Sequence, residues 1–268
     1  MNNQPIGILD SGVGGLSIWK EIVKELPYES TIYLADSINC PYGDRTEAEI
    51  YILAKRLVKF IIQNKAKLIV IACNTITVAC IDKLREEFKG IPIVGTVPPI
   101  KTAARYSNNK KIGILSTLTT SQSIYQKRLI DTFAKNCEVV NISASEVVPF
   151  VERGEVEGKE VKELTEMLLR EFLAKDVDAI ALGCSHFPFL REEIEKIVGS
   201  KVKILDSGNA IARQARRVLT NNNSLSLSKN TLHEFYTTGN AEEFVKVSKK
   251  LVGDKFRRLI KEVQAVSL

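Results

Sequence analysis

Cysteine is scarce in this chain: only five occur among 268 residues, and no two of them form a CxxC pair. An odd and low cysteine count is typical of a reducing compartment, so we expect a cytoplasmic protein without a disulfide framework. The absence of CxxC argues against thiol–disulfide redox chemistry. Because HExxH is also absent, the spacing of potential ligands predicts no metal site.

Long apolar segments are missing as well. No run approaches the about 20 residues that a membrane-spanning helix requires, and residues 1–5 (MNNQP) lack the basic region of a signal peptide. The composition, with 44% hydrophobic and 26% charged residues, is that of an ordinary globular protein, and the length allows two domains. We therefore expect no membrane partner.

The chain has a modest excess of positive charge, with a formal net charge of +6. Its lysines and arginines are spread along helical patterns, and the densest groups, at 213–217 and 255–258, come late in the chain. This distribution favours a solvated basic surface over a nucleic-acid interface. A small anionic substrate would gain modestly from such a field.

Two stretches resemble one another and organise the rest of the chain: residues 68–75 (LIVIACNT) and 179–186 (AIALGCSH). In each, a short apolar run that is typical of a buried parallel strand leads into a cysteine and then into polar residues. Open α/β sheets bind ligands at the carboxyl ends of their strands. One such cysteine is most simply a buried core residue, but two in matched contexts favour a paired site at Cys73 and Cys184.

The remaining pattern alternates strands with helices. We expect strands at 6–9, 31–35, 68–71 and 91–95, a crossover at 96–99, and further strands at 111–115, 137–142, 179–183 and 202–205; residues 220–229 read as a surface loop. The predicted fold class is α/β, with two similar doubly wound domains, mainly parallel sheets and an active site in the cleft between them. Residues 1–97 and 208–268 would form one domain, and 98–207 the other.

A glycine-rich loop at 10–15 (DSGVGG) follows the first strand, and Asp36 ends the second, as in dinucleotide-binding folds. However, Ser17 replaces the third glycine, and Asp10 would place a negative charge beside a pyrophosphate. The loop is better interpreted as a tight turn that presents Asp10 and Ser11 to a cleft, with backbone N–H groups available to a carboxylate. We expect no cofactor here.

Three further features lie near predicted strand ends. The turn 40–43 (CPYG) brings Tyr42 close to a strand end, where it either lines the site or only packs the turn. The hydroxyl-rich loop 116–121 either caps a helix or binds an anion. His186 is one of only two histidines, and on extended backbone it lies on the same side as Cys184.

Four kinds of chemistry suit a pair of cysteines. The first is two-base proton transfer at a stereocentre, for which one thiolate removes a proton and the opposite thiol returns one, with Asp10 and His186 as proton-handling partners. A position at a helix N-terminus would favour the thiolate of Cys73. The second is a zinc site formed by Cys73, Cys184 and His186; the third is redox exchange; and the fourth is ligand binding without catalysis.

Taken together, five motifs resemble those of the glutamate racemases, members of the aspartate/glutamate racemase family. They occur in that family's order and cover nearly the whole chain: residues 10–16 (DSGVGGL), 41–43 (PYG), 72–75 (ACNT), 183–188 (GCSHFP) and 206–208 (DSG). The resemblance implies a cofactor-independent enzyme that interconverts L- and D-glutamate and supplies D-glutamate for peptidoglycan. It also implies a homodimer.

The resemblance further implies the roles of individual residues. Cys73 and Cys184 would be the two acid/bases, aided by Asp10 and His186. Glutamate would be held by residues that are mostly neutral hydrogen-bonding groups: Asp10, Ser11, Tyr42, Gly43, Asn74, Thr75, Thr117, Thr120, Ser185 and His186. Glu152 matches another acidic residue near the family's site.

Two positions depart from the family pattern. Ser185 replaces a threonine, which removes only a methyl group. Pro98 replaces a glutamate or glutamine, so the crossover is either stiffer or differently hydrogen-bonded. Among relatives, aspartate and hydantoin racemases also use two cysteines, whereas arylmalonate decarboxylases keep one. Cys184 therefore argues against decarboxylation, and the choice of glutamate over aspartate rests on the family motifs.

Overall fold

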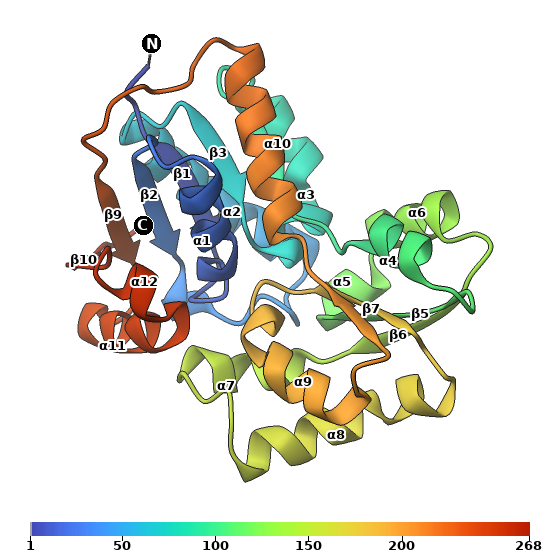
Figure 1. Cartoon of the computed structure of the whole chain (residues 1–268). Coiled ribbons are helices and arrows are strands. Elements are labelled where there is room, and N and C mark those ends of the chain that lie inside the picture. Colours follow the sequence, from blue (N-terminus) through green and yellow to red (C-terminus); the bar gives the residue numbers. More distant parts are fainter. Residues whose placement is uncertain (1) are drawn as a thin grey trace.

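Two separate sheets form the fold, and every strand pairing within the described residues 2–268 is parallel in this computed structural model (Figure 1). The six-stranded sheet has the order β10-β9-β2-β1-β3-β4, and the four-stranded sheet has the order β6-β5-β7-β8. The strands are β1 (Ile6–Asp10), β2 (Thr31–Ala35), β3 (Leu68–Ile71), β4 (Ile93–Gly95), β5 (Lys111–Ser116), β6 (Glu138–Ser143), β7 (Ala179–Gly183), β8 (Lys203–Leu205), β9 (His233–Thr237) and β10 (Val263–Ala265).

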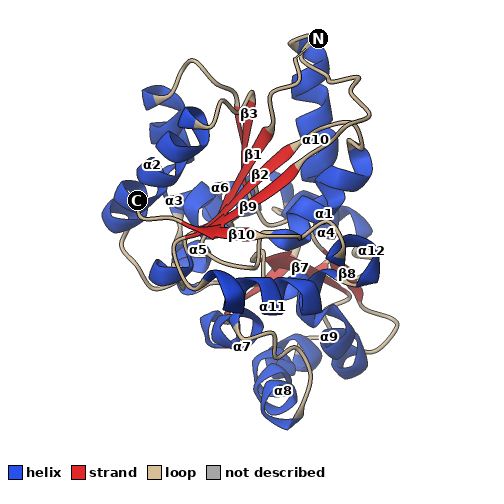
Figure 2. Ribbon diagram, turned by 90° about the vertical axis from the view of Figure 1, so that its left-hand side faces the viewer, coloured by secondary structure: helices blue, strands red, loops and turns tan. Residues whose placement is uncertain are grey.

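Helices connect the strands and cover both faces of each sheet (Figure 2). They are α1 (Leu16–Glu25), α2 (Glu47–Gln63), α3 (Asn74–Glu87), α4 (Ile100–Tyr106), α5 (Leu118–Gln122), α6 (Ile124–Phe133), α7 (Val148–Glu152), α8 (Lys159–Ala174), α9 (Arg191–Val198), α10 (Gly208–Asn221), α11 (Ala241–Val252) and α12 (Asp254–Arg257). Short 3-10 turns occur at Ser37–Asn39, Ser145–Val147 and Phe187–Leu190. Thr46 and Glu49 form a capping box at the start of α2.

Alternation along the strands explains the two covered faces of the six-stranded sheet. Ile6 and Ile8 of β1 pack in one core cluster with α1, α10 and α11, whereas Leu9 packs in the other with α2 and α3. Because neighbouring side chains of a strand point to opposite faces, a strand that is apolar throughout needs helices on both sides. Successive apolar residues therefore predict the doubly wound arrangement, and this prediction is confirmed.

The four-stranded sheet follows the same rule. Ile112 and Ile114 of β5 pack with α4 and α6, while Leu115 packs in the cluster that contains α8 and α9. That second cluster is continuous with the core beneath α1, so it joins the two sheets. The carboxyl ends of β1 and β3 in one sheet thereby face those of β5 and β7 in the other.

The chain passes between the sheets at two places, after β4 and after β8. Ser207 Oγ donates a hydrogen bond to the carbonyl of Val97 (2.5 Å), which ties the two crossings together. Pro98 is buried, and its Cγ lies 2.8 Å from the point that a Cβ of Gly183 would occupy. The proline that departs from the family pattern therefore packs directly beneath the cysteine-bearing end of β7.

The segment 220–229 is largely the predicted surface loop, apart from the end of α10 at Asn221 and one buried residue. Its Ser226 is buried, and the Ser226 N–H donates to Glu29 Oε1 (2.8 Å). The other oxygen of Glu29 pairs with Lys67 Nζ at 2.6 Å, and both side chains are only 2% exposed. Lys67 also donates to the carbonyls of Asn2 and Ser224 (2.5 and 2.7 Å). The prediction is therefore confirmed for most of the segment, while the buried ion pair fixes it locally at Ser226.

At the edge of the six-stranded sheet, β10 pairs parallel with β9. Of the helices in residues 2–268, none is both long and apolar enough to cross a membrane.

Candidate active site

Asp10 ends β1 and is fully buried between the two sheets. Its Oδ1 accepts a hydrogen bond from the Gly12 N–H (3.0 Å), and its Oδ2 accepts one from Ser185 Oγ (3.0 Å). Burial raises the pKa of this carboxyl from 3.8 to about 6, although the nearby charge of His186 opposes the shift. The hydrogen bond from Ser185 connects the end of β1 to the segment that follows β7.

The glycines of residues 10–15 allow neighbouring side chains to approach closely. A Cβ on Gly12 would lie 2.0 Å from Glu152 Oε1, and one on Gly14 would lie 2.4 Å from His186 Nδ1. The N–H groups of Gly12 and Val13 donate to Asp10 Oδ1 (3.0 Å) and Glu152 Oε1 (2.8 Å), respectively. The tight turn thus presents Asp10 as predicted, but these two amides bind the protein's own carboxylates.

Cys73 follows β3 and is the N-cap residue of α3. Its side chain is 4% exposed, and its Sγ lies 3.7 Å from Ser11 Oγ. Burial, reinforced by the negative charge of Asp10, raises the pKa of this thiol from 9.0 to about 12. We expected the helix N-terminus to lower the pKa of Cys73, and this prediction was wrong. In this closed arrangement, the loss of solvation raises the pKa by more than the helix N-terminus lowers it.

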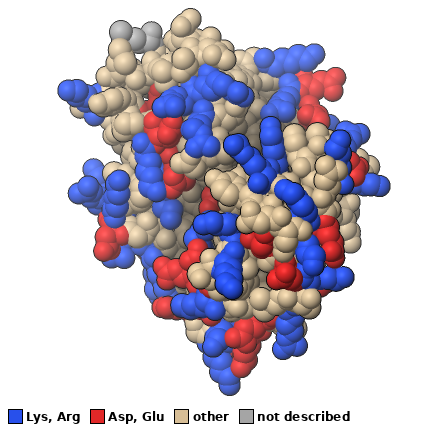
Figure 3. Space-filling view, turned by 45° about the vertical axis from the view of Figure 1, so that its right-hand side comes forward, with Lys and Arg blue, Asp and Glu red and all other residues tan. Residues whose placement is uncertain are grey.

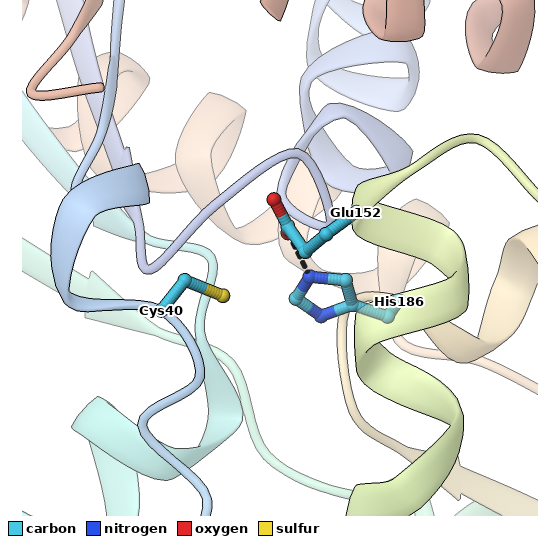
Figure 4. A group of neighbouring side chains, drawn as sticks. All are labelled: Cys40, Glu152 and His186. Atoms are coloured by element: carbon cyan, nitrogen blue, oxygen red, sulfur yellow. Dashed lines mark hydrogen bonds and ion pairs between the residues drawn. The ribbon is translucent and has the colours of Figure 1, made fainter. Parts of the chain in front are cut away.

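Cys184 follows β7 and is joined to a chain of polar groups. Its Sγ lies 3.5 Å from His186 Nδ1. His186 Nε2 in turn lies 2.5 Å from Glu152 Oε1, as Figure 4 shows for this pair. Burial alone would lower the pKa of His186, but contacts with Cys184, Cys40 and Glu152 outweigh it and raise that pKa well above 6.5. The imidazole is therefore positioned to hold or release a proton beside Cys184.

Hydroxyl groups from both sheets meet at a third point. Thr75 Oγ1, at the start of α3, lies 2.9 Å from Thr117 Oγ1 and 3.4 Å from Thr120 Oγ1, and these two are 3.0 Å apart. Beside them, the carbonyl of Gly43 accepts hydrogen bonds from the N–H (2.9 Å) and Oγ1 (2.7 Å) of Thr119. The predicted loop at 116–121 caps a helix through Thr117, and it also contacts Thr75 and Gly43 from the side of the six-stranded sheet.

Two of the candidate residues, Asn74 and Tyr42, differ in whether their polar groups have hydrogen-bond partners. Asn74 is buried, and its Nδ2 has no hydrogen-bond partner within the described residues 2–268. A buried donor of this kind costs free energy unless a ligand satisfies it. Tyr42, in contrast, donates its hydroxyl to Asp36 Oδ2 (2.5 Å) and is 1% exposed.

Sequence reasoning missed three residues near the site. Cys40 was interpreted only as part of a turn, yet it contacts the pair of His186 and Glu152. Asp36 supports Tyr42. Ser17, noted as a missing glycine, donates its Oγ to the carbonyl of Ser185 (2.8 Å) across the two sheets. A polar residue on the buried face of α1 was the available signal for Ser17.

Access to the centre is narrow in this arrangement, since Cys184 is 6% exposed. A neighbouring cavity of about 230 Å³ opens beside Glu152, with Val13, Ser37 and Phe244 in its wall. Both cysteines are therefore largely shielded from solvent in this arrangement.

Comparison with known proteins agrees with this arrangement. Residues 6–215 match the Asp/Glu/Hydantoin racemase family, and the chain belongs to that family. The chain is 39% identical over 258 residues to a glutamate racemase of Clostridium novyi, an alignment that covers 94% of this chain and 98% of that protein. The predicted resemblance to the family is therefore confirmed.

Solved structures give the same result for the fold. A glutamate racemase isoform of Bacillus anthracis superposes with a TM-score of 0.88 at 32% identity, covering 100% of this chain and 99% of that one. A glutamate racemase of Francisella tularensis, solved in complex with D-glutamate, gives a TM-score of 0.86 at 31% identity, covering 100% and 98%. The predicted two-domain α/β fold with parallel sheets is confirmed.

Proposed function

We propose that this protein is a glutamate racemase that interconverts L- and D-glutamate without a cofactor, with Cys73 and Cys184 as its two bases. The observation that carries the proposal is the matched position of these cysteines. Each follows the corresponding strand of its sheet, β3 or β7, and each has its own polar partner, Ser11 or His186. The names of the most similar relatives support glutamate as the substrate.

The mechanism follows from placing one thiol on each side of the substrate. One cysteine, as thiolate, removes the proton from the α-carbon, and the other, as thiol, donates a proton to the opposite face of the resulting carbanion. The electron pair of the C–H bond stays on carbon until the second proton arrives, so inversion needs no external acceptor. Catalysis by positioned acids and bases of this kind contributes typically about 10²–10⁴-fold per group.

Asp10 and His186 would manage the protons of the two thiols. The raised pKa of Cys73 means that this thiol is protonated in the closed, ligand-free protein and is ready to act as the acid. To act as the base it must first lose that proton, and Asp10, with a pKa of about 6, is the buried carboxylate whose charge acts on it. His186 serves Cys184 in the same way, and Glu152 holds the imidazole.

Neutral hydrogen-bonding groups would hold the two carboxylates and the ammonium group of glutamate. The unpartnered Nδ2 of Asn74 is one free donor, and the three clustered hydroxyls of Thr75, Thr117 and Thr120 can turn from one another toward an anion. The other proposed substrate contacts come from Asp10, Ser11, Tyr42, Gly43, Ser185 and His186. For Tyr42, this role requires its hydroxyl to leave Asp36 or its ring to form a wall of the site.

Further parts of the proposal concern the organisation of the protein. Residues 1–97 and 208–268 form one domain and 98–207 the other, which agrees with the two crossings near Val97 and Ser207. The enzyme is a cytoplasmic homodimer that supplies D-glutamate for peptidoglycan and has no membrane or nucleic-acid partner. On the face in Figure 3, basic side chains are interspersed with acidic ones, which supports a solvated surface.

Exchange of hydrogen for deuterium tests the two-base mechanism. In D₂O, the wild type should place deuterium in the newly inverted glutamate, because the returned proton comes from the second thiol. Cys73→Ser and Cys184→Ser should each nearly abolish racemisation, since a serine hydroxyl is too weak an acid and base. Each variant should still exchange the α-hydrogen of one enantiomer, and the two should prefer opposite enantiomers.

A matched control is Cys80→Ser, because Cys80 lies on α3 beyond Cys73 and its thiol is bonded only to the helix, at the carbonyl of Ile76 (3.3 Å). This variant should racemise normally. Mass spectrometry after short reaction times, with L-aspartate as the comparison substrate, measures both exchange and specificity. Transfer of the original hydrogen into inverted product, or full racemisation by either active-site variant, would contradict two separate bases.

A further inference from the structure

A third cysteine lies beside the proton-handling pair and forms a compact group with it. Cys40 comes from the turn after β2, Glu152 from the end of α7 and His186 from the segment after β7, and their side chains point toward one another (Figure 4). One ligand atom from each, a thiol sulfur, a carboxylate oxygen and an imidazole nitrogen, lies within 4.8 Å of the other two. The racemisation mechanism makes no use of Cys40.

We propose that Cys40, Glu152 and His186 form an inhibitory binding site for a thiophilic divalent cation of the Zn²⁺ class. Zn²⁺ binds sulfur at about 2.3 Å and nitrogen or oxygen at about 2.0–2.2 Å, so the ligands of a tetrahedral site lie a few ångströms apart. Small movements of the three side chains would therefore close the group around a cation. A combination of thiolate, imidazole and carboxylate selects Zn²⁺ over the oxygen-preferring Mg²⁺ and Ca²⁺.

The surroundings supply two other features that metal sites require. The N–H of Val13 donates to Glu152 Oε1 at 2.8 Å, and an outer hydrogen bond of this kind holds a carboxylate ligand in place. Glu152 also lines a neighbouring cavity of about 230 Å³, so solvent reaches the carboxylate of the group. No step of the proposed racemisation uses this cation.

A cation bound at this site would block the reaction because it changes what the two ring nitrogens of His186 can do. The ring faces Glu152 with Nε2 (2.5 Å) and Cys184 with Nδ1 (3.5 Å), so a cation between Glu152 and Cys40 takes Nε2. A metal-bound imidazole retains only the Nδ1 hydrogen and can no longer accept a further proton. The imidazole would then hold Cys184 by one fixed hydrogen bond, and the cation would also tie together the turn after β2, the end of α7 and the segment after β7.

Direct binding is tested without any activity measurement, using Co²⁺ as a spectroscopic substitute for Zn²⁺. The full-length wild type should bind one Co²⁺ with a thiolate-to-metal charge-transfer band, and Zn²⁺ should displace it. Cys40→Ser should lose the band and weaken Zn²⁺ binding, by calorimetry, at least about 100-fold, because even the loss of an outer partner typically costs about 10–100-fold. Cys137→Ser, which changes another half-buried cysteine, should bind normally.

Inhibition is the second arm, and it alone depends on the proposed racemase activity. Zn²⁺ should slow the wild type and a chelator should restore it, while Cys40→Ser, compared with its own metal-free rate, should need at least about 100-fold more Zn²⁺. Absence of the cobalt band in the wild type would overturn the proposal. So would a band that survives in Cys40→Ser and disappears in Cys73→Ser or Cys184→Ser, since the metal would then occupy the catalytic thiols.

Discussion

Replacing the buried carboxylate at the end of β1 should make the protein more stable while it removes activity. Asp10 is fully buried, and burial raises its pKa from 3.8 to about 6. A shift of about 2 pKa units corresponds to a cost of about 3 kcal/mol for carrying the charge in the folded protein. In Asp10→Asn, the amide oxygen still accepts the Gly12 N–H, and the charge is absent.

The expected gain depends on pH in a defined direction. Since the folded protein binds the Asp10 proton more tightly than the unfolded chain does, wild-type stability falls as pH rises from about 4 to about 6. Below pH about 4, Asp10 is protonated in both states and burying it costs no charge; above pH about 6, it is ionised in both states and the full cost of the buried charge applies. Allowing for a weaker hydrogen bond with Ser185, Asp10→Asn should gain about 1–3 kcal/mol near neutral pH and nothing near pH 3.

Urea unfolding across this pH range measures the effect. The sequence has a single tryptophan, and Trp19 is fully buried in the domain that contains Asp10, so its fluorescence follows the relevant unfolding. The midpoint should rise with an unchanged slope. Turnover should fall by about 10²–10⁴-fold because a proton-handling group is lost.

Asp178→Asn is a control for which the change in stability should have the opposite sign, because the pKa of Asp178 is lowered and not raised. Partial burial opposes ionisation of Asp178, but hydrogen bonds from Ser107 and from the backbone N–H groups of Asn109 and Asn108 outweigh it and lower the pKa. This variant should therefore lose stability at neutral pH, as followed by circular dichroism. If Asp10→Asn were less stable than the wild type near pH 8, or equally altered at every pH, burial of its charge would not be the cause.

Two other variants test close packing and buried charge. Gly14→Ala places a Cβ 2.4 Å from His186 Nδ1. It should reduce turnover by about 10²-fold in a folded protein, because displacing a catalytic side chain by about 1 Å has that effect. Gly90→Ala, at a position with open space around it, should leave turnover unchanged in the same assay. Lys67→Met should lower the free energy of unfolding, measured with urea, by about 3–5 kcal/mol, because Glu29 stays buried and unpaired. Adding Glu29→Gln should recover part of that loss. Equal stability of Lys67→Met and wild type would contradict this reasoning.

The fold was largely predictable because its signals are local. Apolar strands such as Leu68–Ile71, each followed by a helical pattern, specify parallel strands covered on both sides. The position of Asp10 and of the two cysteines at strand ends was predictable for the same reason. Their roles in catalysis stay predictions until the variants are measured.

The parts that were not predictable depend on contacts between distant segments. The proximity of Cys40 to His186 arises only when the two sheets face one another, since 146 residues separate them in the chain (186 − 40). The raised pKa of Cys73 likewise reflects burial by both halves, which outweighs the local helix effect that the sequence suggested. Burial of Ser226 depends on the ion pair of Lys67 and Glu29, whose partners come from two other segments.

The strand order suggests how a single site came to treat mirror-image substrates alike. The sequence β2-β1-β3-β4 in one sheet has the same pattern as β6-β5-β7-β8 in the other, and each cysteine follows the equivalent strand. Such a repeat is what duplication and fusion of one ancestral gene would leave, with the present cleft descended from the interface of a homodimer. An ancestor of this kind would have offered one thiol from each subunit, related by a twofold axis. In the proposed mechanism the two thiols exchange the roles of base and acid between the two directions of the reaction, so one pair of groups inherited from such a repeat serves both enantiomers.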